Sequence, residues 1–239
     1  MILCIDIGNT SITYAILENN NFNSINRISS NKHELNITDN SNIKHIAISS
    51  VVPNLTDYYQ QFFNQKFNIN PFIVNHQNCN INLNVDSPHE VGADRICNVI
   101  GAREKYGTPS IVIDFGSATT YDIIDENGAF IGGAIAPGID VSANYLIKKA
   151  ALLNKTAFQF PSNVIGKNTE TNLQSGIMYG GLDSVEGMIR RIKKELNYKK
   201  MNIVLTGGFS HLISNKMTSK HILDESIRLY GLKLILNNQ

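Results

Sequence analysis

Two short stretches of the chain place an aspartate and a glycine in the same pattern. Asp6-Ile7-Gly8-Asn9 and Asp114-Phe115-Gly116-Ser117 each end an apolar run and precede a second run of strand-forming residues. Glycine lets a turn bring its backbone N–H groups close to an anion, because it has no Cβ. Two such turns could grip one polyphosphate, with the carboxylates beside bound cations. One turn alone is common hairpin chemistry, so the repetition carries the inference.

Two further segments could contribute to the same chemistry. Thr206-Gly207-Gly208 ends a later apolar run, and its glycines would let a nucleoside lie against the backbone. Asp94 and Arg95 begin an expected helix. Asp94 points away from the apolar face of that helix and Arg95 flanks it, so the carboxylate could accept a proton from a hydroxyl. The Asp-Arg pair could equally be a surface pair near a helix N-terminus, where an acid is favoured. Gly166-Lys167-Asn168-Thr169 does not fit a P-loop.

The surrounding elements predict an α/β fold with an internal duplication. Each half starts with an apolar strand and a turn, and each has a later strand ending in small residues, at 46–50 and 203–208. Helical spacing follows Pro53 and recurs from 182 to 196, which is most simply core packing. The breaker pair before Pro109 predicts two domains, 1–108 and 109–239. The apolar segment 229–236 could cap the second domain or join a dimer surface, and structural packing is the favoured interpretation.

Composition limits the classes of partner. The 239 residues are 42% hydrophobic and 17% charged, with a formal net charge of +1 and no block of one sign. We therefore expect no nucleic-acid partner and no membrane surface as partner. No stretch approaches the ~20 apolar residues of a membrane helix. The three cysteines are far apart and unpaired in sequence, which favours the cytoplasm.

Six segments resemble, in order, the motifs of type III pantothenate kinases. They are Asp6-Ile7-Gly8-Asn9-Thr10, Glu90-Val91-Gly92-Ala93-Asp94-Arg95, Asp114-Phe115-Gly116-Ser117-Ala118-Thr119-Thr120, Gly132-Gly133-Ala134-Ile135-Ala136-Pro137-Gly138, Ile165-Gly166-Lys167-Asn168-Thr169 and Thr206-Gly207-Gly208. The resemblance implies two ribonuclease-H-like (actin-like ATPase) domains whose mixed sheets face a central cleft, and a homodimer. It also implies the reaction: the γ-phosphoryl group of ATP passes to the terminal hydroxyl of pantothenate, giving 4′-phosphopantothenate for coenzyme A synthesis.

The resemblance assigns roles by position. Asp94 takes the place of the proton acceptor, and Asp114 that of a residue that binds a monovalent cation, K⁺ or NH₄⁺. Asp6 also stands where a carboxylate suits Mg²⁺. The expected pantothenate contacts are Val85, Gly92, Ala93, Asp94, Arg95 and Thr169. The expected ATP contacts, including the third glycine turn, are Asp6, Ile7, Gly8, Asn9, Thr10, Ser11, Ile12, Thr13, Ser117, Gly207 and Gly208.

Three positions depart from the family pattern. Val85 stands where many members have a tyrosine that contacts the substrate, Ser117 replaces a commoner threonine and keeps the hydroxyl, and Tyr121 replaces a usual phenylalanine. Other readings stay open beside the kinase. A non-catalytic regulator could use the same fold; an actin- or chaperone-like ATPase, a sugar or acetate kinase, or a polyphosphate phosphatase would belong to the same superfamily.

Overall fold

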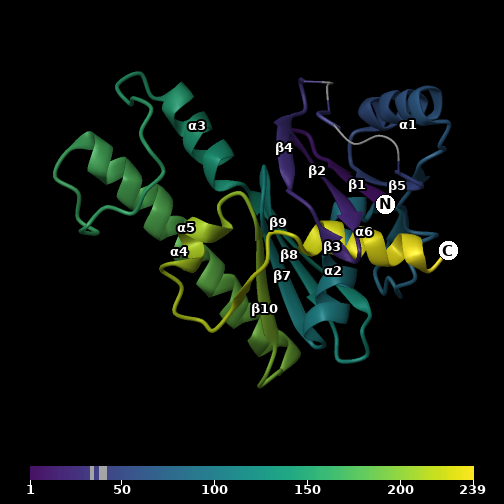
Figure 1. Cartoon of the computed structure of the whole chain (residues 1–239). Helices are drawn as coiled ribbons and strands as arrows, with labels where there is room; N and C mark the ends of the chain where they lie inside the picture. Colours follow the sequence, from purple (N-terminus) through teal and green to yellow (C-terminus); the bar gives the residue numbers. More distant parts are fainter. Residues whose placement is uncertain (33–34, 38–41) are drawn as a thin grey trace. The chain divides into compact units, whose positions relative to one another are not determined.

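The computed structural model describes residues 1–32, 35–37 and 42–239, and it has the expected α/β architecture with two sheets (Figure 1). The chain forms two compact units. The first comprises Met1–Thr108, Asp122–Gly132 and Ser226–Gln239, and the second Pro109–Tyr121 and Gly133–Glu225. A break falls after Thr108, at the expected boundary, but the first unit also takes in two later segments. The division into domains 1–108 and 109–239 stays a prediction.

The first unit is built on a mixed sheet with the order β3-β2-β1-β5-β6, in which β4 also pairs with β2. Its strands are β1 (Ile2–Ile7), β2 (Ser11–Glu18), β3 (Asn21–Phe22), β4 (Asn26–Ser29), β5 (His45–Ser50) and β6 (Phe72–Ile73). Strand β1 runs antiparallel to β2 and parallel to β5. Because β1 is central and apolar on both faces, it needs helices on both sides.

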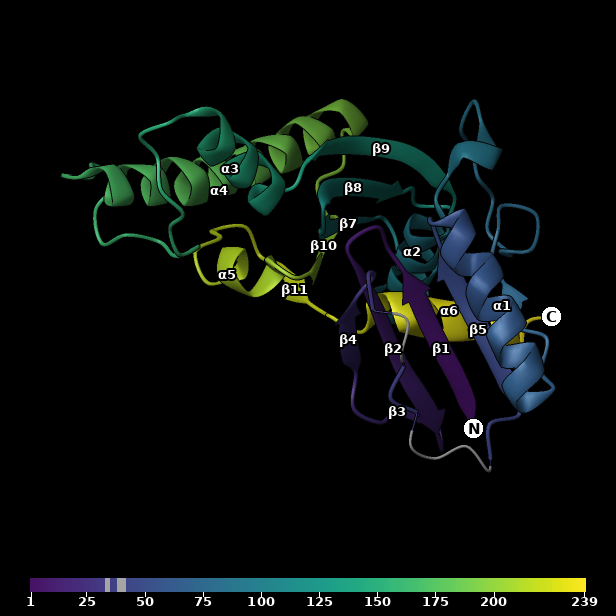
Figure 2. The same ribbon diagram turned by 90° about the horizontal axis from the view of Figure 1, so that it is seen from above.

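Helices cover the two faces of this sheet separately (Figure 2). Helix α1 (Pro53–Phe67) packs Tyr59 and Phe63 on the face that carries Leu3 and Ile5. Helices α2 (Ala93–Tyr106) and α6 (Ile227–Asn237) pack on the opposite face, around Cys4. A short 3₁₀ helix, η1 (Pro88–Glu90), precedes α2.

The C-terminal apolar segment is packed in the core, as favoured from the sequence, but it covers the first unit and not the second. Helix α6 packs against α2, β1 and β5 of the first unit, with Leu229, Leu232 and Ile235 buried. Two glycines allow this close packing. A Cβ at Gly231 would collide with the Cys97 carbonyl of α2, and one at Gly101 would collide with the Ile227 carbonyl of α6. The helices therefore meet backbone to backbone.

The second sheet has the order β11-β10-β7-β8-β9. Its strands are β7 (Ser110–Phe115), β8 (Ala118–Ile124), β9 (Phe130–Pro137), β10 (Asn202–Gly207) and β11 (Ile222–Leu223). The second unit contributes helices α3 (Ile139–Lys149), α4 (Thr169–Leu196) and α5 (Ser210–Ser214). On α4, Leu182, Val185 and Ile189 are buried, as their helical spacing predicts. Within the described ranges, no helix combines the length and apolarity needed to cross a membrane.

The register of the two sheets supports the inferred duplication. Strand β1 pairs in parallel with β5 so that Asp6 lies opposite Ser49. Strand β7 pairs in parallel with β10 so that Asp114 lies opposite Thr206. Each repeat therefore sets a carboxylate next to a hydroxyl residue at the carboxyl end of two parallel strands, the edge where ligands bind in open α/β sheets.

Candidate active site

The first glycine turn connects β1 to β2. The Gly8 N–H donates to the Ser11 carbonyl at 3.0 Å, and a Cβ on Gly8 would lie only 3.2 Å from that oxygen. Ser30 braces the turn, since its hydroxyl donates to the Gly8 carbonyl at 2.6 Å. Asn9 and Thr10 are exposed at the tip of the turn.

The expected ATP segment 6–13 is not uniformly accessible. Ile7 and Ile12 are fully buried in the core, so only their backbone could face a nucleotide. The Ser11 hydroxyl accepts a hydrogen bond from Arg27 Nε at 2.9 Å. Arg27 therefore brings a positive charge next to Ser11, at the start of β2. This charge was not predicted from the sequence.

Asp6 lies at the end of β1, and its side chain is almost fully buried. Its Oδ1 accepts a hydrogen bond from the Ser49 hydroxyl at 2.9 Å, and its Oδ2 accepts one from Nη1 of Arg228 on α6. Burial raises the pKa of Asp6, Arg228 opposes that rise, and the nearby charge of Asp94 adds to it. Two carboxylates thus face one guanidinium in this region.

Asp94 occupies the first turn of α2. The helix begins at Ala93 after Gly92, and Asp94 Oδ1 accepts a hydrogen bond from the Arg95 N–H at 2.8 Å. A Cβ on Gly92 would lie 2.5 Å from that carboxylate oxygen, so glycine leaves room for the Asp94 side chain. Asp94 is partly exposed, whereas Ala93 is buried. A partly exposed carboxylate held at a helix start is suitable for orienting a hydroxyl group.

Arg95 turns toward a buried partner on β8. Its Nε donates to Asp122 Oδ1 at 2.6 Å, and its guanidinium lies 5.3 Å from the centre of the Phe130 ring. The Asp122 side chain is fully buried, whereas that of Arg95 is 16% exposed. This pair makes Arg95 a fixed rather than a mobile cation at the start of α2.

Val85 lies in the first unit, beside β9. The Asn84 N–H donates to the Phe130 carbonyl, and Val85 Cγ1 lies 3.9 Å from the position of a Cβ on Gly132. Val85 is partly exposed and apolar. It can supply contact area to a substrate but not the hydroxyl of a tyrosine.

The second glycine turn connects β7 to β8 in the second unit. The Gly116 N–H donates to the Ala118 carbonyl at 3.0 Å, and Ser117 is exposed at the tip. Gly138 packs directly on this turn, and a Cβ there would collide with the Gly116 carbonyl. Gly138 therefore supports the backbone of the turn, while the tip of the turn at Ser117 is exposed.

Asp114 and the third glycine turn lie next to each other in the second unit. Gly207 has a φ of +89°, and a Cβ there would collide with Asp114 Oδ1. Glycine therefore lets the backbone at 207 pack directly against the Asp114 carboxylate and the Phe115 backbone. The buried Asp114 carboxylate could serve as an oxygen cradle for a monovalent cation. Gly208 is exposed just beyond it. Asp114 would hold the cation and offset its charge.

Asp6 is less suited to direct Mg²⁺ binding. Both of its oxygens already accept hydrogen bonds, and one of them pairs with a guanidinium. A divalent cation in contact with this carboxylate would meet the like charge of Arg228. Among the described residues, no group of three or more His, Cys, Asp or Glu side chains could form a metal site. Mg²⁺ would therefore arrive with the nucleotide phosphates, as it does in many kinases.

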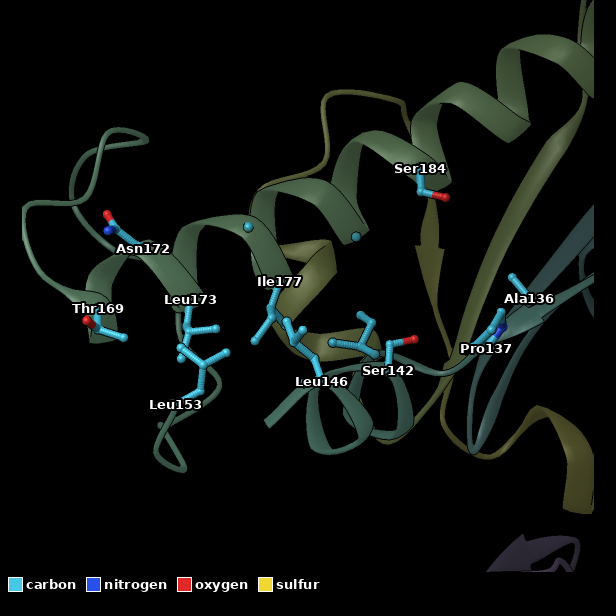
Figure 3. A pocket seen from close by; sticks show the side chains of 14 residues that line it. Ala136, Pro137, Ser142, Leu146, Leu153, Thr169, Asn172, Leu173, Ile177 and Ser184 are labelled. Carbon is cyan, nitrogen blue, oxygen red and sulfur yellow. The ribbon is translucent and has the colours of Figure 1, made fainter. Parts of the chain in front are cut away.

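Thr169 starts α4 and lines a pocket of about 740 Å³ between α3, α4 and the end of β9 (Figure 3). The pocket is mostly apolar, with Leu146, Leu153, Leu173 and Ile177 among its walls. Asn168 caps α4 by accepting a hydrogen bond from the Thr171 N–H at 2.8 Å, which fixes Thr169 at the rim.

The structure thus groups the predicted residues by unit. The first unit brings together segment 6–13 and the start of α2, and the second brings together Asp114 and Gly207. Their meeting across a cleft stays a prediction. Three residues of this region, Ser49, Asp122 and Arg228, were not predicted as site residues. Strand register could have suggested Ser49, but no local signal links Arg228 to Asp6.

Comparisons with known proteins identify the family of the chain. The family model for the type III pantothenate kinase matches residues 2–191. A type III pantothenate kinase of Thermomicrobium roseum is 40% identical over 98% of this chain and 95% of its own length. One from Listeria monocytogenes is 40% identical over 98% and 96%, respectively.

Two solved structures show the fold. A Baf-family transcriptional activator of Campylobacter jejuni superimposes with a TM-score of 0.65 at 21% identity, covering 99% of this chain and 98% of its own. The activator of 2-hydroxyisocaproyl-CoA dehydratase from Clostridium difficile, with bound ADPNP, gives 0.51 at 13% identity, covering 100% and 96%. Sequence likeness over nearly the whole length, rather than the fold alone, decides the assignment: the chain belongs to the type III pantothenate kinase family.

Proposed function

We propose that this protein transfers the γ-phosphoryl group of ATP to the terminal hydroxyl of pantothenate, with Asp94 as the proton acceptor. Membership of the family supports the reaction. The observation that carries the residue assignment is the placement of Asp94. It is a partly exposed carboxylate at the start of α2, close enough for its charge to act on Asp6 beside the Gly8 turn.

Positioning and charge neutralisation do most of the work in phosphoryl transfer, because the transition state is loose. The Gly8 and Gly116 turns would bind the phosphates through backbone N–H groups, aided by Thr10 and Ser117. Mg²⁺ bound to the phosphates would neutralise charge on them. Asp94 would orient the attacking hydroxyl and accept its proton late in the reaction.

The pantothenate end of the site would use residues around α2 and α4. Gly92 and Ala93 present a small backbone surface beside Asp94, and Thr169 offers a hydroxyl at the rim of the pocket. Val85 would contribute apolar contact. Arg95, held by Asp122, supplies a fixed positive charge that suits the carboxylate of pantothenate.

We further propose a homodimer formed through the second unit. Large apolar side chains are exposed on the second unit: Ile135, Val141, Tyr145, Leu146, Leu152, Val164 and Ile165. Leu152 is 90% exposed and Ile165 is 83% exposed, which is costly for a face left in water. A second copy would bury this surface.

Analytical ultracentrifugation should give a dimer for the wild type, and the charged variant Ile165→Glu should shift the protein toward monomer. A monomeric wild type contradicts the proposal.

A coupled assay tests the function directly. Purified protein with ATP, Mg²⁺ and K⁺ should form ADP only when pantothenate is added, and omitting K⁺ or NH₄⁺ should lower the rate through the Asp114 site. ADP formation that does not depend on pantothenate would point to another kinase or ATPase of the superfamily. Nucleotide binding without turnover on any acceptor would favour a regulator.

The free thiols of Cys4, Cys79 and Cys97 fit a cytoplasmic setting for this reaction.

A further inference from the structure

The carboxylate at the end of β1 is held by residues from two distant parts of the chain. Ser49 donates to Asp6 Oδ1 from the neighbouring parallel strand, and Arg228 donates to Asp6 Oδ2 from the start of α6. Arg228 lies 222 residues away in sequence, and its side chain is 22% exposed, against 4% for that of Asp6. The pair is therefore almost completely removed from water on the aspartate side.

We propose that Arg228 is a positioning residue of the ATP site, acting through Asp6 on the Gly8 turn. This inference rests on the proposed function, because it assumes that the nucleotide phosphates bind at this turn. Arg228 fixes the Asp6 carboxylate and balances its charge. Asp6 then serves to anchor and organise the turn, rather than to bind Mg²⁺ directly.

Charge is the first argument. A buried carboxylate two residues before Gly8 would repel a triphosphate bound at the turn, and Asp94 adds a second negative charge to the same region. Arg228 is the cation that the structure places in direct contact with Asp6. Without it, the turn would present an uncompensated negative charge to an incoming polyanion.

The second argument is that α6 does not need Arg228 for its own attachment. Its docking on α2 and β1 is apolar, through Leu229, Leu232 and Ile235, and the close crossing is set by Gly231. An arginine at the first turn of that helix is costly to desolvate, and it contributes little to this apolar contact. Its place beside Asp6 is better explained by the turn than by the helix.

The third argument is geometric. Only Ile7 separates Asp6 from Gly8, and the Ile7 side chain is fully buried. Both Asp6 oxygens are engaged, which restrains rotation of the carboxylate, and the Ser30 hydroxyl holds the Gly8 carbonyl. A turn that is already rigid loses little conformational entropy when it binds phosphate.

The test compares Arg228→Gln and Arg228→Lys with a matched control, Arg103→Gln. Arg103 lies in the last turn of α2, whereas Asp94 lies in the first, and it pairs with Glu104 at 2.8 Å; the side chains are 25% and 46% exposed. Affinity for a non-hydrolysable ATP analogue is measured by calorimetry, the KM values for ATP and pantothenate by the coupled assay, and stability by thermal unfolding. Analogue binding remains informative even if pantothenate turns out not to be the acceptor.

Arg228→Gln should weaken analogue binding about tenfold or more and raise the KM for ATP in parallel, while the KM for pantothenate changes less than about twofold. Arg228→Lys should restore most of the binding, and it keeps the test valid if the glutamine variant fails to fold. The double variant Asp6→Asn with Arg228→Gln should bind no worse than the weaker single variant, because the two residues act together. Normal analogue affinity in folded Arg228 variants, or a loss equal to that of Arg103→Gln, would overturn the proposal.

Discussion

Helices α2 and α6 pack backbone to backbone at Gly231, and Gly231→Ala tests this contact. The new Cβ would collide with the Cys97 carbonyl oxygen, lie 2.8 Å from the Cys97 carbonyl carbon and lie 3.0 Å from the Gly101 nitrogen. All three atoms belong to helix backbone, so no side chain can rotate away. Since comfortable carbon–carbon contacts are about 3.5–4.0 Å, α6 would have to move outward by roughly 1 Å.

The size of the effect follows from two opposing terms. Overpacking typically costs 1–3 kcal/mol, and a collision with backbone belongs at about 3 kcal/mol or above. Replacing glycine by alanine inside a helix stabilises the helix by about 1 kcal/mol. We therefore expect Gly231→Ala to lower the free energy of unfolding by about 2 kcal/mol or more. The outward shift would also draw Arg228 away from Asp6, so the KM for ATP should rise.

Urea denaturation followed by circular dichroism gives the measurement, because the chain has no tryptophan to report by fluorescence. Gly187→Ala on α4 is the matched control: its Cβ would meet only the Arg190 side chain, at 3.7 Å, so the variant should be about 0.5–1 kcal/mol more stable. If Gly231→Ala proves as stable as Gly187→Ala, the backbone-to-backbone crossing is not as close as the structure has it, and the reasoning fails.

Three further outcomes are expected. Asp94→Asn should lower kcat by about 100-fold or more while affinity for an ATP analogue stays near normal; near-normal turnover would remove Asp94 from the mechanism. Gly207→Ala, with a φ of +89° and a Cβ directed at Asp114, should raise the KM for ATP and abolish the response to K⁺, and an unchanged K⁺ titration would argue against the cation cradle. Burial raises the pKa of the Cys4 thiol from 9.0 to about 12, so its contribution to stability is complete below pH 9 and is lost as the pH rises toward 12. Between pH 9 and pH 12, the free energy of unfolding of Cys4→Ala, measured with urea, should therefore fall by about 1.4 kcal/mol less per pH unit than that of the wild type. Equal slopes for the two proteins would contradict the assignment.

Local patterns in the sequence predicted the elements that carry the turns. The apolar runs before Gly8 and Gly116 form β1 and β7, and the helical spacing after Pro53 forms α1. These features depend on neighbouring residues, so periodicity and glycine placement suffice to identify them. The internal duplication was also readable, because both copies keep the carboxylate at the same strand position.

Contacts between distant segments were not predictable in the same way. The apolar spacing of α6 says that one face is buried but not which unit buries it, and it was assigned to the wrong one. Arg228 and Asp122 carry no local signature, because their partners, Asp6 and Arg95, are brought to them only by the tertiary fold. The roles of Asp94 and Thr169 came from the family resemblance, since an acid at a helix start is by itself ambiguous.

The discontinuity of the first unit has a consequence for synthesis in the cell. Strand β1 leaves the ribosome long before α6, with the whole second unit translated between them. Until α6 emerges, the sheet face around Cys4 and the apolar side of α2 lack their cover. The second unit can fold as it is made, whereas the first must wait, which leaves an interval in which chaperones can bind the nascent chain and in which early termination would yield an aggregation-prone fragment.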